Sequence, residues 1–152
     1  MAPDVSPVAA WESLFRAQVS VMRQLATEFP TDIVSFNEYD VMFNLFGQPG
    51  KTLRIRDLGE KVLLTQPSIS RLVDRLVSRG ILEKHDDPSD GRGTLVALTE
   101  KGVQTYRQAA VIHGASISDH MSGTLSGEEL DELTRLCDKL RVGVAARTAS
   151  AR

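Results

Sequence analysis

The sequence is poor in several features that define large classes of proteins. Its 152 residues include one cysteine, Cys137, which excludes an intramolecular disulfide and fits a reducing cytoplasm. No apolar run approaches the roughly 18 residues of a membrane span, and no basic segment followed by an apolar one suggests a secretory signal. Aromatic residues make up only 5% of the chain, but 41% of its residues are apolar, which indicates a globular protein. One compact domain in the cytoplasm is therefore expected.

No charge of one sign dominates the chain either. The formal net charge is −2, which by itself does not indicate a polyanionic partner. The distribution is uneven, because residues 51–107 hold 11 Lys and Arg against 8 Asp and Glu, whereas the remainder holds 7 against 12. A basic middle between acidic flanks would steer a negatively charged partner to one region of the molecule.

Apolar residues at helical spacing predict two helices at the start of the chain. The first covers residues 8–29 and is stopped by Pro30. Ser35 and Glu38 have the spacing of a capping box, in which each side chain satisfies a free amide at the start of a helix. The helix that follows this box is expected to end at Gly47.

Two further helices are predicted at the end of the chain. One runs from Thr99 to about Met121, and a second capping box, Ser126 with Glu129, opens the last one. The large apolar residues of the last helix are expected to be buried, and residues 148–152 to be frayed.

The middle of the sequence has the pattern of a helix–turn–helix. A short helix at residues 56–62 and a second at 66–79 are separated by a three-residue turn, and Thr65 is suited to cap the second helix. The small Gly59 would let the second helix pack closely across the first. Four apolar residues form the expected buried stripe of the second helix: Ile69, Leu72, Val73 and Leu76. Its polar residues then face outward: Gln66, Ser68, Ser70, Arg71, Asp74, Arg75 and Ser78.

Two short strands follow at once, ILEKH and TLVALT, joined by the loop DDPSDGRG. A hairpin directly after a helix–turn–helix is the wing of a winged helix. The predicted fold is therefore mainly α, an α+β winged helix–turn–helix flanked by N- and C-terminal helices.

Three motifs at their spacing in this sequence resemble the MarR family of bacterial transcription regulators. They are Val73-Asp74-Arg75-Leu76 with Gly80, Asp90 with Arg92, and Leu98-Thr99 with Gly102. The resemblance covers nearly the whole chain. It implies a homodimer in which the terminal helices pair and two winged helices read the halves of a palindrome. Many members of the family release DNA when a small molecule or an oxidant binds.

The resemblance also implies how the chain is divided. We expect a single MarR-type domain over residues 1–152. Residues 1–34 and 104–152 would form the dimerisation helices. Residues 35–103 would form the DNA-binding winged helix–turn–helix, with its recognition helix at 66–79 and its wing at 82–98.

The outward face of the recognition helix carries the side chains suited to reading DNA. Gln66, Ser68, Ser70 and Arg71 are expected at base edges in the major groove, with Arg71 bidentate to a guanine. Arg75, one turn later, and Thr65, at the helix start, are better placed for phosphates. The alternative is that these residues merely form a solvated helix face.

Arg92 is predicted at the tip of the wing, where it could enter a narrow minor groove. Gly91 and Gly93 would permit a tight turn with unusual backbone angles, and Asp90 would, by analogy with the family, pair with Arg92. The alternative is an ordinary hairpin turn with an exposed charge. A calcium loop is excluded because Pro88 and Ala97 would occupy two positions that require oxygen ligands.

Four other residues carry weaker signals. His113 and His120 share one helix face and could hold a metal or an anion, but surface or interface histidines are expected and no metal or other cofactor is predicted. Cys137 lies on an apolar stripe and is expected to be a buried structural thiol rather than an oxidant sensor. Trp11 lies where some family members line an effector cavity; packing in the dimer core is the alternative.

Together these features favour a homodimeric, sequence-specific regulator that binds double-stranded DNA. A repressor released by a small-molecule effector is the expected form. A winged helix used for protein contacts is the alternative, which the retained arginines at positions 71, 75 and 92 disfavour. An enzyme is not expected, because no nucleophile lies beside a base and no phosphate-binding loop is present.

Overall fold

The computed structural model describes residues 6–62 and 64–151 of the chain. These residues belong to two units, which span residues 1–113 and 114–152. The first unit contains the helix–turn–helix and the wing. Among the described residues, no helix is both long and apolar enough to cross a membrane.

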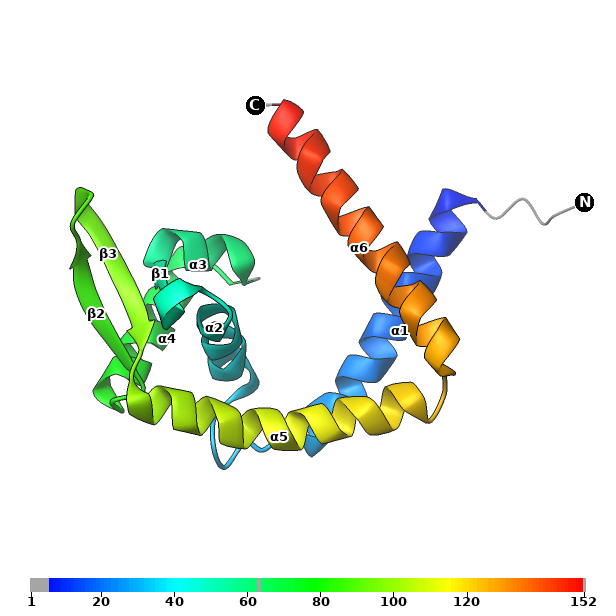
Figure 1. Ribbon diagram of the computed structural model, residues 1–152, viewed down its shortest axis with the longest axis horizontal. Helices are drawn as coiled ribbons and strands as arrows, with labels where there is room; N and C mark the ends of the chain where they lie inside the picture. The colour runs from blue at the N-terminus through cyan, green and yellow to red at the C-terminus, as the bar shows by residue number, and fades with distance from the viewer. Residues whose placement is uncertain (1–5, 63, 152) are drawn as a thin grey trace, which may run out of the picture. The chain divides into compact units, whose positions relative to one another are not determined.

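The order of elements is that of a mainly helical winged helix with additional helices at both ends, as predicted (Figure 1). Their bounds are α1 Pro7–Glu28, α2 Phe36–Phe46, a 3-10 turn at Pro49–Lys51, β1 Thr52–Arg54, α3 Ile55–Lys61, α4 Gln66–Ser78, β2 Leu82–Asp87, β3 Asp90–Leu98, α5 Glu100–Ser122 and α6 Gly127–Ser150.

Side-chain caps begin the helices where the sequence predicts them. Ser35 accepts the Glu38 N–H at 3.2 Å, and the Glu38 carboxylate accepts the Ser35 N–H at 2.9 Å. Thr65 accepts the Ser68 N–H at 3.4 Å at the start of α4. These bonds satisfy amides that lack a partner within the helix, so each start is defined locally.

The core of the first unit lies between α2, α3, α4 and the sheet. All four residues of the predicted α4 stripe are buried. They pack with side chains from the neighbouring elements, chiefly Met42, Leu45, Leu58, Ile81, Leu82 and Val96. Burial of each such side chain stabilises the fold by roughly 1.5–3 kcal/mol. This packing holds α4 with its polar residues turned away from the core.

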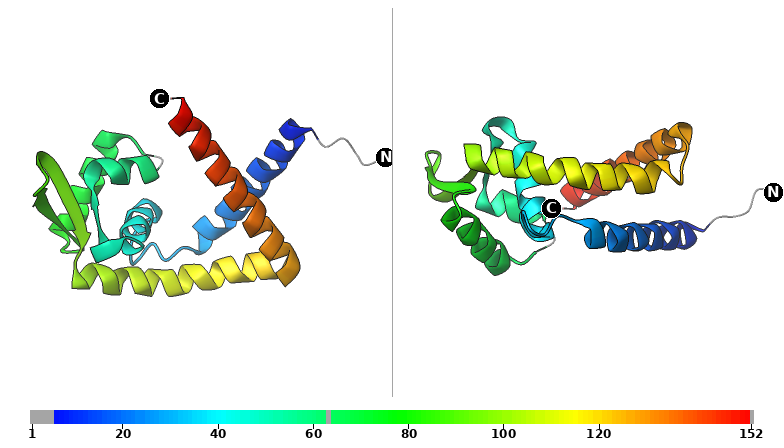
Figure 2. Two further views of the ribbon diagram at one scale, coloured as in Figure 1. Left: turned by 45° about the horizontal axis from the view of Figure 1, so that its top comes forward. Right: turned by 90° about the horizontal axis from the view of Figure 1, so that it is seen from below.

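The wing belongs to a three-stranded antiparallel sheet rather than to an isolated hairpin. Its strand order is β1-β3-β2, and β1 pairs with the end of β3 so that Leu53 lies opposite Val96. The short segment at residues 52–54 therefore anchors the base of the wing. The β2–β3 hairpin extends at one edge of the first unit (Figures 1 and 2).

The tip of the wing differs from the prediction. The turn consists of Pro88 and Ser89, because Asp87 pairs with Asp90 and β3 begins there. The next pair toward the base joins Asp86 to Thr94, so residues 91–93 form a bulge without cross-strand partners. Arg92 thus lies beside the turn and not in it.

Gly91 and Gly93 were expected to permit a tight turn with unusual backbone angles, but neither lies in the turn or has a positive φ. The only glycines with positive φ in the described part of the chain are Gly50 and Gly80. Gly93 lies in a tight space, since a Cβ there would lie 3.1 Å from the Cβ of Asp87. A Cβ at Gly91 would meet no atom within 4 Å.

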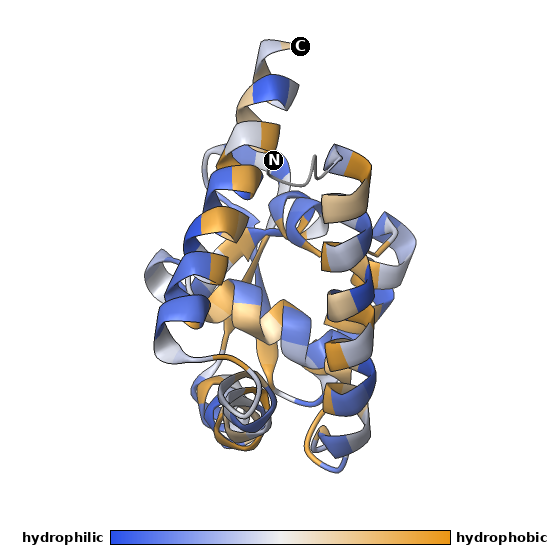
Figure 3. Cartoon of the chain, turned by 90° about the vertical axis from the view of Figure 1, so that its right-hand side faces the viewer, coloured by the Kyte–Doolittle hydropathy of each residue, from blue (hydrophilic) through white to orange (hydrophobic). Residues whose placement is uncertain are grey.

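In the second unit, α6 is helical through Ser150, so the expected fraying of residues 148–150 is wrong. Hydroxyl bonds along the helix, such as Ser150 to the Ala146 carbonyl at 3.1 Å, continue to its last turn. Apolar residues recur along α6 as orange bands in Figure 3. Leu140 and Val144 are 53% and 57% exposed, which contradicts the expected burial of this stripe within one chain.

Candidate nucleic-acid interface

The outer face of α4 gathers the residues predicted to read DNA. Thr65, Gln66, Arg71 and Arg75 are exposed, and Ser68 and Ser70 are half-buried. The Thr65 hydroxyl is already engaged in capping, since it also donates to the Ser68 hydroxyl at 2.9 Å. The face is polar and carries two cations, which is the chemistry required to contact bases and phosphates.

Gln66 rests on the preceding helix. A Cβ at Gly59 would overlap the Gln66 side-chain amide and would lie 3.3 Å from Cδ1 of Ile69. Gly59 therefore allows the close approach of α3 and α4 that its small size predicted. It also leaves the space in which the Gln66 side chain lies.

Arg75 and Arg79 are both held by Glu38, a residue that the sequence pattern assigned only to capping. Glu38 Oε1 accepts the Nε–H of Arg75 at 3.2 Å, and Oε2 accepts an Nη1–H of Arg79 at 3.0 Å. Arg79 also donates to the carbonyl of Ile33 at 3.0 Å. Arg75 and Arg79 are four residues apart, in the last turn of α4 and directly after its end, so they share one helix face. This spacing was the signal in the sequence for their common partner.

A hollow of about 260 Å³ lies between the start of α2 and α4. Its lining consists of Asn37, Leu64, Ser68, Arg71, Leu72 and Arg75. Three of these are predicted DNA-contacting residues. Asn37 comes from a different helix and was not predicted.

Asp74 connects the recognition helix to the wing. Its carboxylate forms an ion pair with Lys84 of β2. Both side chains are substantially exposed, at 63% and 39%, so the pair orients these elements more than it stabilises them.

Arg92 projects from the bulge of β3 and is exposed. Asp90 accepts the backbone N–H of Arg92 at 3.1 Å, so it constrains the main chain beside the arginine. No ion pair of the Arg92 guanidinium occurs among the described residues. The guanidinium therefore remains available to a partner molecule.

The turn of the wing is held by a buried carboxylate. Asp87 Oδ1 accepts both the N–H and the hydroxyl of Ser89, at 2.9 and 2.7 Å. Asp87 Oδ2 forms an ion pair with Nε of Arg54 at 2.6 Å. The bonds from Ser89, followed by the charge of Arg54, hold the pKa of Asp87 below its usual value.

His113 is buried, which corrects the expectation of a surface or interface histidine. Its ring meets those of Phe29, Phe36 and Tyr39 at centroid distances of 5.2, 5.6 and 5.2 Å. Its Nδ1 has no hydrogen-bond partner among the residues that the structure describes, and burial lowers the pKa of His113. Burial, followed by the neighbouring Tyr106, raises the pKa of Tyr39.

In the part of the chain that the structure describes, no three His, Cys, Asp or Glu residues are grouped so that they could hold a metal ion.

Cys137 is exposed in the single chain, so the expected burial of its thiol is wrong. The physical reason is that α6 presents its apolar stripe without a covering element inside the second unit.

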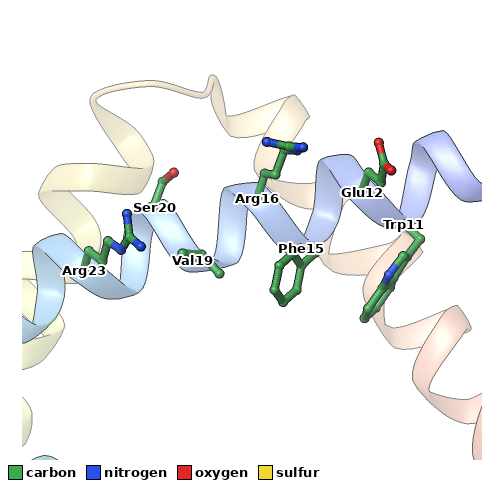
Figure 4. Close-up of a pocket in the computed structure, with 7 residues that line it drawn as sticks. All are labelled: Trp11, Glu12, Phe15, Arg16, Val19, Ser20 and Arg23. Atoms are coloured by element: carbon green, nitrogen blue, oxygen red, sulfur yellow. The ribbon is translucent and has the colours of Figure 1, made fainter.

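Trp11 lies on α1 beside Phe15, with ring centroids 5.9 Å apart. A hollow of about 610 Å³ lies along this helix, and the residues lining it all belong to α1. In Figure 4, Trp11, Phe15 and Val19 point to one side of the helix, whereas Glu12 and Arg16 point to the other. The helix therefore has one apolar side, and its two aromatic residues are exposed.

Comparison with known proteins shows the family to which the chain belongs. Residues 34–93 match the model of the MarR family. The transcriptional regulator HosA of Escherichia coli is 30% identical over 103 residues, which cover 68% of this chain and 74% of HosA. The chain belongs to the MarR family. Its members are transcriptional regulators, not enzymes.

Other MarR-family proteins agree in sequence and fold. The regulator MhqR of Bacillus subtilis is 34% identical over 93 residues, or 61% of this chain and 62% of MhqR, which is less than two thirds of that relative. PcaV of Streptomyces coelicolor, solved with its natural ligand, is 29% identical over 96% of this chain and 99% of its own, with a TM-score of 0.65. Sco3205 from the same organism, solved with DNA, shares the fold at a TM-score of 0.75 and 24% identity, over 88% and 85% of the two chains.

Proposed function

We propose that two copies of this chain bind an inverted repeat in double-stranded DNA and repress transcription until a small molecule releases them. The observation that carries this proposal is the polar outer face of α4, which lies beside a wing whose Arg92 guanidinium forms no ion pair with the described residues. In the proposal, Gln66, Ser68, Ser70 and Arg71 contact base edges, Thr65 and Arg75 contact phosphates, and Arg92 enters the minor groove.

Exposed apolar side chains support the proposed dimer. Trp11 and Phe15 of α1 are 60% and 53% exposed, and α6 exposes Leu136, Leu140 and Val144. Such stripes are favourable only when another surface covers them. We assign dimerisation to residues 1–34 and 104–152 and DNA binding to residues 35–103, as the sequence predicted.

Release by a small molecule is the family's usual control. PcaV was solved with its natural ligand, and the apolar side of α1 around Trp11 is the surface that we propose for an effector here. A regulator of this kind acts where the DNA lies, so the cytoplasm is the proposed location.

Selection of bound duplexes from a randomised DNA pool at about 150 mM salt tests the proposal. We expect an enriched inverted repeat whose half-sites lie about one helical turn, 34–36 Å, apart. Light scattering should give the mass of a dimer, both free and on the selected duplex. A monomer at micromolar concentration, or salt-sensitive binding without enrichment, would favour a winged helix used for protein contacts instead.

A further inference from the structure

We propose that the hollow between the start of α2 and α4 holds one backbone phosphate of the bound duplex, and that Asn37 is a contact residue of this phosphate. The site differs from the predicted contacts because Asn37 comes from outside the recognition helix and the wing. The inference rests on the proposed function and adds the chemistry of one position in the interface.

The lining of the hollow contains four residues with hydrogen-bond donors and two leucines. Asn37 contributes an exposed amide, Ser68 a hydroxyl, and Arg71 and Arg75 two guanidinium groups, while Leu64 and Leu72 complete the lining. In the proposal, Asn37 and Arg75 donate hydrogen bonds to the phosphate oxygens, whereas Ser68 and Arg71 border the hollow and reach base edges. Arginine adds charge-assisted bonds that are stronger than neutral ones.

The charge of the lining also favours an anion. It includes two arginines and no carboxylate. Glu38 lies behind Arg75 and is only 5% exposed, and its two oxygens are occupied by Ser35, Arg75 and Arg79. Because Glu38 binds Arg75 through Nε, the terminal nitrogens of that guanidinium stay free to donate to a phosphate.

A second hollow of about 260 Å³, between the start of α3 and the bulge of β3, is less suited to an anion. It is also lined by arginines, at positions 54, 56 and 92, but Asp90 is part of its lining. Arg54 is paired with Asp87, and Arg56 lies 3.9 Å from Asp57. Carboxylates therefore offset its positive charge.

The test combines Asn37→Ala with a scan of the selected duplex, in which a neutral methylphosphonate replaces each backbone phosphate in turn. Asn37→Ala should weaken binding by about tenfold, the usual effect of losing a hydrogen bond to a charged group. A methylphosphonate at one position per half-site should weaken the wild-type complex but cause no further loss in Asn37→Ala. Asn44→Ala is the matched control, because Asn44 lies on the same helix and bonds to Asp40.

A second variant separates binding from folding. Asn37→Asp should keep or raise the melting temperature, since an acidic residue in the first turn of a helix is favourable. The same carboxylate should repel the phosphate, so Asn37→Asp should bind DNA more weakly than Asn37→Ala. Opposite effects on stability and binding are not expected of a residue with a purely structural role.

The results can contradict the inference in three ways. If Asn37→Ala binds the selected duplex as tightly as wild type, or is weakened equally by every methylphosphonate, the hollow does not hold a backbone phosphate. The proposed function would stand in either case. If millimolar inorganic phosphate raises the melting temperature of DNA-free wild type but not of Asn37→Ala, at matched ionic strength, and the two proteins bind the selected duplex equally, the hollow is a site for free anions instead. If the wild-type protein selects no duplex, both proposals fail.

Discussion

The carboxylate of Glu38 joins the start of α2 to the recognition helix by accepting the Nε–H of Arg75 at 3.2 Å. The same side chain closes the capping box with Ser35 and binds Arg79. A buried carboxylate requires such partners, because loss of its hydration is otherwise costly. One residue therefore both starts a helix and orients an arginine that we expect to contact DNA.

Glu38→Gln should weaken DNA binding even though it removes a negative charge from the interface. Glutamine has one acceptor oxygen in place of two, so it cannot satisfy Ser35 and both arginines. We expect binding about tenfold weaker and a salt slope lower by about one unit, as for loss of one phosphate contact. Titrations at several salt concentrations measure both quantities.

A double-mutant cycle with Arg75→Ala provides the control for this prediction. If Glu38 acts by positioning Arg75, the effect of Glu38→Gln on binding should largely disappear in the Arg75→Ala background. Tighter binding by Glu38→Gln would show that only its charge matters.

Gly59→Ala should alter DNA preference more than stability. The added methyl group would displace the flexible Gln66 side chain, whereas Ile69 at 3.3 Å has to yield by only a few tenths of an ångström. Alanine also has the higher helix propensity. Selection with this variant should show a changed preference at the base pair that Gln66 contacts, with a melting temperature within a few degrees of wild type. An unchanged consensus would mean that Gln66 does not read a base.

Gly102→Ala should destabilise the protein strongly. A Cβ at this position would overlap the backbone carbonyl of Ile81, which cannot move aside as a side chain can. Overpacking of this kind typically costs about 1–3 kcal/mol, and more where backbone must shift. Gly114→Ala, also on α5, is the matched control because its Cβ would meet no atom within 4 Å. Denaturant unfolding should show loss for the first variant and no loss for the second.

Arg92→Ala should weaken binding to all duplexes and lower the salt slope by about one unit, because it removes one cation from the interface. The exposed guanidinium forms no ion pair within the described chain, so stability should not change. Salt titrations on selected and random duplexes give the slope. An unchanged slope would place Arg92 away from DNA.

His113 should make folding stability fall as the pH is lowered. Burial depresses its pKa below the ordinary value of 6.5, so the unfolded chain takes up a proton at a higher pH than the folded one. The penalty begins as the pH falls through about 6.5 and grows toward the depressed pKa. His113→Leu should lose less stability than wild type between about pH 8 and 5.5. Gly114→Ala, on the same helix, is the control and should lose stability with pH as wild type does, because its Cβ would meet no atom within 4 Å.

The order of elements could be predicted because its signals are local. Capping boxes at Ser35 and Ser126, the cap at Thr65 and the apolar stripe of α4 each act over a few residues, so neighbouring side chains determine them. The same locality allowed the polar outer face of α4 to be recognised before the fold was known.

Features that depend on contacts between distant segments were missed or predicted incorrectly. The pairing of β1 with β3 and the bulge around Arg92 follow from strand register. The burial of His113 follows from the meeting of α5 with Phe29 and the start of α2. No short sequence window contains both partners of these contacts.

The sequence by itself determined the helices, the wing and the chemistry of the recognition face, because each depends on side chains close together along the chain. Only the tertiary structure decided how Glu38 holds Arg75 and that Asn37 joins Ser68 and Arg71 around one hollow. Glu38 and Asn37 are each more than 30 positions from these partners along the chain. Packing of α2 against the core brings them together, and packing depends on the whole fold.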